Sequence, residues 1–397
     1  MPWKETDPMS ERLGFVTALR KRKTSFRSLC CAFGVAPKTG YKWLHQFEAS
    51  GPAGLQDRSR RPLSNSRAIS AAVGERLVEL RQAHPTWGPK KLVAWLETHE
   101  RRWQVPAPST VGELLKRRGL VSPRQRARYQ RRSDPLGHAD KPNAVWAMDF
   151  KGWFLLGDGT RCDPLTLTDA WSRYLLCCKA GTAVGDTVAS DVWEALVGLF
   201  REYGMPWAIR VDNGQPWAAP KGNLGITKLA VKIIKVGITL ERIEPGKPQQ
   251  NGRHERFHLT LQQETARPPS RSMRAQQQRF DAFRREYNEQ RPHEALQQRP
   301  PAALYVSSPR PFPDRIDEPE YPCWYEVLRP KSWGHITFRG CDYFISSALH
   351  RERVGLVEVE EGCFEVYFRS VLLGRIHTAH PELGLITASE VLPMSPV

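Results

Sequence analysis

The sequence predicts a multidomain protein with N-terminal all-α helix-turn-helix units, a central α/β core and a small C-terminal β-barrel. Three observations support this fold class. The first third is basic and has apolar residues at helical spacing; residues 142–305 hold strand-like runs followed by alternating strands and helices; and residues 333–373 alternate apolar and polar side chains between short turns. The last two patterns are typical of a sheet covered by helices and of a small barrel.

Positive charge is concentrated in the first third of the chain. Residues 1–135 hold 27 Lys and Arg against 11 Asp and Glu, whereas residues 136–397 hold 32 against 31. Such a basic segment attracts polyanions, because each phosphate that it neutralises releases condensed counterions. A solvated basic face without a partner is the alternative, and charge alone does not separate the two.

A helix-turn-helix pattern lies within this basic segment. Two helical patterns, at residues 26–33 and 37–47, flank a short turn that contains a glycine. The second helix of such a pair enters the DNA major groove. The residues that we expect to contact DNA there are Lys38, Thr39 and Lys42. Gly40 is an exception inside the second helix, where glycine costs about 1 kcal/mol relative to alanine. A simple pair of packed helices is the alternative.

Residues 63–122 carry a second set of helical patterns. We expect helices at residues 69–83 and 89–97, and a third helix that Ser109 caps and that closes at Gly119. Eight Lys and Arg and no acidic residue follow at 116–132. Those that we expect to track a DNA backbone are Arg117, Arg118, Arg124, Arg126 and Arg128. A solvated linker without a partner is the alternative.

The central region has the pattern of an α/β domain. Strand-like runs are expected at 144–150, twice within 164–180, at 207–211 and at 238–242, and helices at 186–203, 229–236, 251–265 and 275–290. Together these patterns give six segments. They are a helix-turn-helix DNA-binding domain (1–62), a second helical DNA-binding domain (63–122), a basic linker (123–140), the α/β core (141–306), a Pro-rich linker (307–322) and the barrel (323–397).

Membrane and zinc-thiolate proteins are disfavoured. No apolar stretch approaches the ~18 residues that span a bilayer, and the N-terminus lacks the apolar core of a signal peptide. The eight cysteines and eleven histidines form no zinc-ligand pattern. We therefore expect free thiols in a reducing compartment, and a cytoplasmic protein associated with the nucleoid.

Three acidic residues stand where a metal site needs them. Asp149 lies within an apolar strand-like run, and burying its charge without a cation or donor is costly. Asp212 follows the strand at 207–211 and precedes an Asn-Gly turn, and Glu255 lies one turn into a helix after a Pro- and Gly-rich loop. Hard oxygen ligands of this kind suit Mg²⁺ or Mn²⁺. Taken singly, Asp212 is also compatible with a plain turn former and Glu255 with an exposed helix residue.

The motifs around these acids resemble a known family. They read Val145-Trp-Ala-Met-Asp-Phe-Lys, Ile209-Arg-Val-Asp-Asn-Gly and Pro248-Gln-Gln-Asn-Gly-Arg-His-Glu-Arg-Phe, with Tyr287-Asn-Glu-Gln-Arg-Pro-His-Glu-Ala-Leu downstream. Their order and neighbours are similar to those of bacterial insertion-sequence DDE transposases, whose RNase H-like catalytic core is shared with retroviral integrases. The segment between Asp212 and Glu255 is longer than is usual in that group, and we place the extra length around residues 218–225.

The resemblance implies a DNA transposase that recognises the ends of its own mobile element. Asp149, Asp212 and Glu255 would hold two Mg²⁺ or Mn²⁺ ions for phosphodiester cleavage and for transfer of the 3′-OH ends to target DNA. Additional substrate contacts are expected from Asn213, Asn251 and His254. The resemblance also implies DNA as the partner, both terminal repeats and target, and at least a dimer on that DNA.

Several alternatives remain on the sequence alone. One is a non-catalytic helix-turn-helix regulator derived from a transposase, and another is a plain nuclease that cuts without joining. Glu264, Glu241 and Asp169 are rival carboxylates, although Asp169 with Arg173 is better explained as a structural pair in a strand turn. His258 is a further candidate ligand, for which an ordinary surface position is the simpler interpretation. A tyrosine or serine recombinase is disfavoured, since the arginines near Tyr129 are consecutive linker residues.

Overall fold

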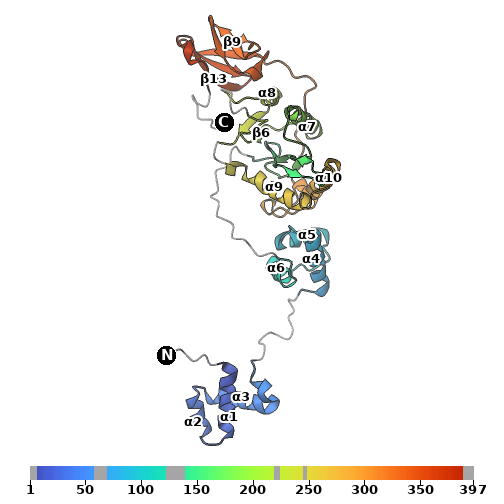
Figure 1. Cartoon of the computed structure of the whole chain (residues 1–397), viewed down its shortest axis with the longest axis vertical. Coiled ribbons are helices and arrows are strands. Elements are labelled where there is room, and N and C mark those ends of the chain that lie inside the picture. The colour runs from blue at the N-terminus through green and yellow to red at the C-terminus, as the bar shows by residue number, and fades with distance from the viewer. Residues whose placement is uncertain (1–6, 58–68, 122–138, 219–223, 245–247, 388–397) are drawn as a thin grey trace. The chain divides into compact units, whose positions relative to one another are not determined.

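The structure is a computed structural model that describes residues 7–57, 69–121, 139–218, 224–244 and 248–387 (Figure 1). It separates into two compact units, Met1–Ala68 and Ile69–Val397. In the described ranges, no helix is both long and apolar enough to cross a membrane.

The N-terminal unit is a three-helix bundle that contains the predicted helix-turn-helix. Its helices are α1 (Pro8–Arg20), α2 (Phe26–Ala32) and α3 (Pro37–Ser50). Ser25 caps α2 by accepting a hydrogen bond from the backbone N–H of Ser28, and Gly34 takes a left-handed φ of 63° in the turn. The first helix, α1, was not predicted from the sequence, and it supplies Phe15 and Val16 to the core.

Gly40 has a packing role in this bundle. It is the buried glycine of α3, and a Cβ built on it would lie 2.9 Å from Phe15, 3.0 Å from the Cys30 sulfur and 3.1 Å from Phe26. Any larger residue would push α3 away from the other two helices. The glycine that disfavoured the second helix on propensity therefore allows its close approach.

A second helical bundle begins the second unit. It consists of α4 (Ala71–Ala83), α5 (Pro89–His99) and α6 (Pro108–Arg117), which pack around the fully buried Trp87. The prediction that Ser109 caps the third helix was wrong. Ala107 is the N-cap, its side chain makes no capping bond, and Pro108 occupies the first turn. A proline is tolerated there because its missing N–H would have no helical partner.

The core contains a five-stranded mixed sheet in the order β5-β4-β1-β6-β7. Its strands are β1 (Val145–Phe150), β4 (Leu165–Asp169), β5 (Leu175–Lys179), β6 (Ala208–Val211) and β7 (Thr239–Arg242). Neighbouring β1, β4 and β5 are antiparallel, whereas β6 runs parallel to both β1 and β7. A short hairpin of β2 (Phe154–Leu155) and β3 (Arg161–Cys162) follows β1.

Two pairs of helices cover the two faces of this sheet. One face packs its apolar side chains, among them Trp146 and Met148 of β1, against α7 (Val188–Tyr203) and α8 (Lys228–Lys235). The other face packs against α9 (Gly252–Thr265) and α10 (Met273–Glu289). Because side chains alternate along a strand, Ala147 and Asp149 point away from Trp146 and toward the α9 face.

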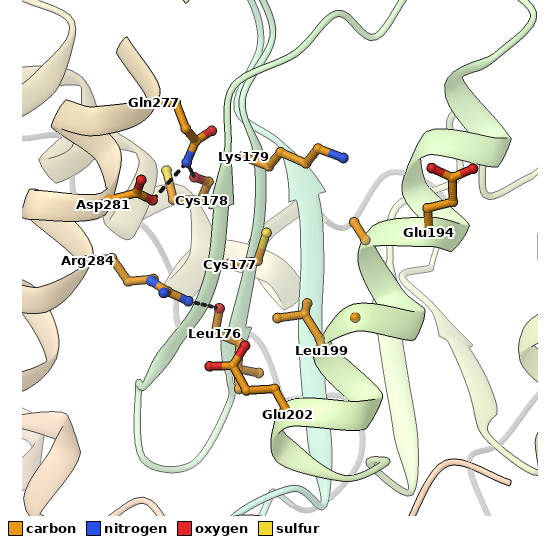
Figure 2. Close-up of a pocket in the computed structure, with 12 residues that line it drawn as sticks. Leu176, Cys177, Cys178, Lys179, Glu194, Leu199, Glu202, Gln277, Asp281 and Arg284 are labelled. Atoms are coloured by element: carbon orange, nitrogen blue, oxygen red, sulfur yellow. Dashed lines mark hydrogen bonds between the residues drawn. The ribbon is translucent and has the colours of Figure 1, made fainter. Parts of the chain in front are cut away.

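Polar side chains of α10 cap the open edge of the sheet at β5. The amide of Gln277 donates to Cys178 O and accepts from Ala180 N, and Arg284 donates to Leu176 O. Asn288 makes a similar pair of bonds with the backbone of Leu175. Figure 2 shows the pocket that remains between β5, α7 and α10. No residue of the predicted triad lines it, so the candidate site lies elsewhere.

The C-terminal region is a sheet domain, and no closed barrel forms among the described residues. Five strands run in the order β14-β13-β12-β11-β8, and β9 and β10 form a separate pair. Their bounds are β8 (Glu326–Leu328), β9 (His335–Phe338), β10 (Cys341–Phe344), β11 (Val354–Glu360), β12 (Cys363–Phe368), β13 (Val371–His377) and β14 (Ile386–Thr387). The predicted barrel is not confirmed, because β14 and β8 end the sheet without pairing with each other.

Candidate active site

Asp149 and Asp212 are brought together by the pairing of two parallel strands. In the register of β1 and β6, Ala147 lies opposite Arg210. Two residues further along each strand, the same register places Asp149 beside Asp212, which directly follows β6. Both side chains belong to the face that α9 covers.

The turn after β6 fixes the orientation of Asp212. Its Oδ1 accepts a hydrogen bond from the backbone N–H of Gly214 at 3.0 Å. A Cβ on Gly214 would lie 3.2 and 3.3 Å from the two carboxylate oxygens, so a glycine leaves room for them. The Asn213 amide donates to Ile243 O at 2.6 Å and thereby ties the turn to the end of β7.

Helix α9 is held against β4 by two histidines. The Thr166 hydroxyl donates to Asp149 O at 3.0 Å and lies 2.8 Å from Nε2 of both His254 and His258. The Nδ1 of His254 lies 3.1 Å from the Thr168 hydroxyl. Burial lowers the pKa of His254 to about 3 and that of His258 to about 2, so both rings are neutral near pH 7. This network fixes the helix that carries Glu255.

These contacts change the interpretation of the two histidines. Both ring nitrogens of His254 are hydrogen-bonded in the interior, which leaves neither for a DNA contact in this arrangement. His258 does not have the surface position that we expected, because its ring also packs beside Thr166. The threonines were missed at the sequence level. The signal was the run Leu165-Thr-Leu-Thr-Asp, in which leucine and threonine alternate between the two faces of β4.

Burial and like charge raise the pKa of the Asp149 carboxyl to about 7. Burial is the larger cause, the Asp212 carboxylate adds to it, and Glu255 contributes in the same direction, while the backbone N–H of Phe150 opposes them. Within the described residues, no Lys, Arg or His pairs with any of these three carboxylates. The site therefore concentrates negative charge that a bound cation would stabilise.

The side chains as placed do not yet form a complete metal cage. Across the described part of the chain, no group of three or more His, Cys, Asp or Glu is arranged to hold a metal ion. Asp149 and Asp212 are both half-buried, whereas Glu255 is exposed. The two aspartates fit a divalent cation by position and charge, and Glu255 joins them only if its side chain turns toward them.

The rival carboxylates all have partners of their own. Glu264 pairs with Arg291, and Glu241 accepts from Arg210 at 2.9 Å. Asp169 is structural, as expected, and the Arg173 backbone N–H donates to Asp169 O at 3.0 Å, although their side chains form no ion pair among the described residues. The Asp169 carboxylate accepts from the backbone of Asn143 and from both the N–H and the hydroxyl of Ser172.

The predicted DNA-contact residues have varied surroundings. Lys38, Thr39 and Lys42 are exposed on α3. In the second bundle, Arg117 is exposed and bonds Glu113 O within its own helix, and Arg118 pairs with Glu75. Asn251 is buried at the start of α9. The remaining three, Arg124, Arg126 and Arg128, lie outside the described residues, as does most of the expected insertion at 218–225.

Comparison with known proteins adds independent information. Residues 236–301 match the integrase core domain, residues 11–62 a helix-turn-helix domain and residues 39–115 a homeodomain-like domain. Solved structures that match the chain include the simian T-cell lymphotropic virus intasome in complex with PP2A regulatory subunit B56 gamma, which is 13% identical and covers 75% of this chain and 97% of that chain at a TM-score of 0.34. The catalytic core domain of BIV integrase is 18% identical, and the match covers 41% of this chain and 93% of that chain at a TM-score of 0.30.

Curated relatives come from insertion elements. An uncharacterized 31.7 kDa protein of insertion element IS407 from Burkholderia multivorans is 29% identical over 238 residues, which cover 56% of this chain and 76% of the relative. An uncharacterized 39.2 kDa protein of insertion element IS476 from Xanthomonas euvesicatoria is 28% identical over 268 residues, which cover 65% of this chain and 72% of the relative. The chain is therefore similar to proteins of insertion elements, and it contains a segment that matches the integrase core domain. The helix-turn-helix matches indicate DNA binding.

Proposed function

We propose that this chain is an active DNA transposase that cleaves the ends of its own element and joins the freed 3′-OH ends to target DNA. The observation that carries the proposal is the proximity of Asp149, in β1, to Asp212, just after the parallel neighbour β6, with no cationic partner for either among the described residues. Three carboxylates without a structural partner are expected at a cation site, and the rival acids lack this property.

The cofactor in this proposal is Mg²⁺ or Mn²⁺, held as two ions by Asp149, Asp212 and Glu255. Bound there, the ions supply the positive charge that activates the attacking oxygen and stabilises the leaving 3′ oxygen. The chain provides carboxylate oxygens, which these hard cations prefer. It also provides a rigid frame, since Gly214 orients Asp212 and the Thr166 network fixes α9.

Recognition of the element ends is assigned to the helical bundles. The exposed side of α3 presents Lys38, Thr39 and Lys42, which suits a major groove. Arg117 and Arg118, at the end of α6, and the arginines of the following segment add backbone contacts in this proposal. Asn213 and Asn251 are proposed to contact the substrate beside the triad. We also propose that two or more copies assemble on DNA to pair the element ends.

The test is incubation of the purified chain with labelled duplexes of its element ends, a target plasmid and Mg²⁺. The proposal predicts nicked ends and joined products, both lost in Asp212→Asn. Tight binding with no chemistry over a range of metals would identify a DNA-binding regulator instead. Cleavage without any joined product would identify a nuclease.

A further inference from the structure

A small basic pocket lies on the same face of the sheet as the proposed catalytic carboxylates. We call it the arginine pocket; its lining includes Arg173, Arg253, Asn251, Ala147 and Thr168. Ala147 is two residues before Asp149 on β1, and Thr168 is its antiparallel partner on β4. Two residues along a strand span about 6.6 Å, so the pocket lies one step of the sheet away from the carboxylates.

Arg173 lines this pocket and makes no side-chain ion pair among the described residues, although the Asp169 carboxylate is near enough to raise its pKa. It sits in the turn between β4 and β5, where its backbone takes a left-handed φ of 66° that non-glycine residues seldom adopt. The nearest acid in sequence, Asp169, is occupied by Ser172 and Asn143. In the part of the chain that the structure describes, no side chain forms an ion pair with the Arg173 guanidinium.

Arg253 brings a second guanidinium to the same place. Its side chain is exposed, and its hydrogen bond to Ala170 O is long, at 3.5 Å. Burial lowers the pKa of Arg173 to about 10, and the positive charge of Arg253 adds to this effect, while Tyr287 and Asp169 oppose it. Two like charges therefore face a common space. Arg210, which also lines the pocket, differs because Glu241 neutralises it.

Asn251 adds a polar side chain at the same pocket. The residue is only 6% exposed, and its amide is not among the buried side-chain groups that lack a hydrogen-bond partner in the described residues. The pocket therefore brings one amide and two guanidinium groups, all of which carry N–H donors, to one place.

The charge of the pocket indicates its ligand. The cavity, about 30 Å³, has room for water but does not enclose a base, a sugar or a phosphate, so a ligand would bind at its mouth. Guanidinium groups bind phosphate oxygens well, because their planar N–H donors match two oxygens at once. A phosphate can reach these donors from outside while the rest of its nucleotide stays in solvent.

We propose that Arg173, Arg253 and Asn251 bind a backbone phosphate of the DNA strand that is being cut, close to the scissile phosphodiester. This inference rests on the proposed function, because it takes that strand as the ligand. Binding there would fix the position of the strand relative to the carboxylates without reading its sequence. The target strand is the other possible source of the phosphate, and the experiment separates the two.

The experiment measures binding of DNA in which single phosphates are replaced by neutral methylphosphonates. One series carries the replacement along the cleaved strand near the element end, and a second carries it along a target strand. The experiment compares three full-length proteins: wild type, the double variant Arg173→Gln with Arg253→Gln, and the single variant Arg173→Lys. Metal is left out, so that DNA binding is measured apart from cleavage. Arg201→Gln, an exposed arginine of α7 on the opposite face of the sheet, is the matched control.

We expect one replacement in the cleaved strand to weaken wild-type binding by about tenfold, the effect of losing one hydrogen-bonded charge contact. The double variant should bind unmodified DNA about tenfold more weakly and be indifferent to that replacement, while Arg173→Lys and Arg201→Gln remain sensitive. The proposal would be overturned if the double variant stayed sensitive to every methylphosphonate, so that the losses of affinity simply added. It would also be overturned if the double variant became insensitive only to replacements in the target strand. Binding that follows this pattern in a chain that never cleaves would refute the proposed function and leave the arginine pocket intact.

Discussion

Asp149 of β1 lies close to Asp212, which directly follows the adjacent parallel strand β6, and the charge of Asp212 raises the pKa of Asp149. Neither has a cation of this chain beside it in the described residues. Such a pair is unfavourable unless something positive binds between its members. Five expected outcomes follow from this arrangement and its surroundings.

Neutralising Asp149 should stabilise the metal-free chain at high pH. Because the folded pKa of about 7 exceeds the ordinary value of 3.8, stability is lost as pH rises between these two values. We expect Asp149→Asn to raise the melting temperature at pH 8 and to change it much less at pH 4. Mn²⁺ should raise the melting temperature of wild type at pH 8, since it binds the folded state, and should not raise that of the variant. An equal Mn²⁺ effect on both would contradict a site at Asp149.

The buried histidines should make the core sensitive to acid. Their folded pKa values lie below the ordinary 6.5, so the stability that they contribute is present above pH 6.5 and is lost as pH falls toward 3. A double variant, His254→Gln with His258→Gln, should lose less stability between pH 7.5 and pH 5 than wild type does. Thermal unfolding at several pH values measures this. The exposed His350→Gln is the control and should keep the wild-type dependence.

Gly40→Ala should destabilise the N-terminal unit. The added methyl would overlap Phe15, Cys30 and Phe26, a cost of about 1–3 kcal/mol that exceeds the gain of about 1 kcal/mol in helix propensity. Gly14→Ala in α1 is a matched control, because its Cβ would meet nothing closer than 3.7 Å and only the propensity gain applies. Hydrogen exchange of residues 8–55 in the full chain measures both. Faster exchange in Gly14→Ala than in Gly40→Ala would refute the packing role.

Lys38→Gln with Lys42→Gln should weaken binding to the element ends and reduce its salt dependence. Each lost phosphate contact lowers the slope of log affinity against log salt by about 0.9 on duplex DNA. The control is the double variant Lys179→Gln with Arg201→Gln, which removes two exposed positive charges from the surface of the central α/β domain. Fluorescence anisotropy over a range of salt concentrations gives the slopes. If both double variants shifted the slope equally, α3 would have no special role in binding.

The sequence predicted the elements of the core because their apolar spacing is regular. The expected strand at 144–150 became β1 and the expected helix at 251–265 became α9, each within a residue or two. Barrel closure could not be predicted, because it depends on the pairing of the short edge strands β8 and β14, which side-chain alternation does not encode. Helix α1 was missed because its apolar residues, which include Leu13, Phe15 and Val16, are spread around the helix and do not form one clear stripe.

The sequence predicted the acidic residues of the candidate site but not the surroundings of all of them. An ordered set of acids pointed to Asp149 and Asp212, and the strand register explains why they meet. The inward position of His254 was overlooked, although His254, Phe257, His258 and Leu261 form a stripe at helical spacing that faces the sheet. Nothing in sequence spacing tells how far Glu255 stands from the two aspartates, because that depends on the loop that precedes α9.

Strand cleavage by Glu255→Gln and Glu264→Gln tests the central claim most directly. Both glutamates lie on α9, but Glu264 is already paired with Arg291. With Mg²⁺ and labelled element-end DNA, Glu255→Gln should lose cleavage by about a thousandfold or more, because several kcal/mol of metal catalysis disappear. Glu264→Gln should still cleave, with its folding checked by thermal unfolding. Full activity of Glu255→Gln together with an inactive but folded Glu264→Gln would contradict the proposed triad.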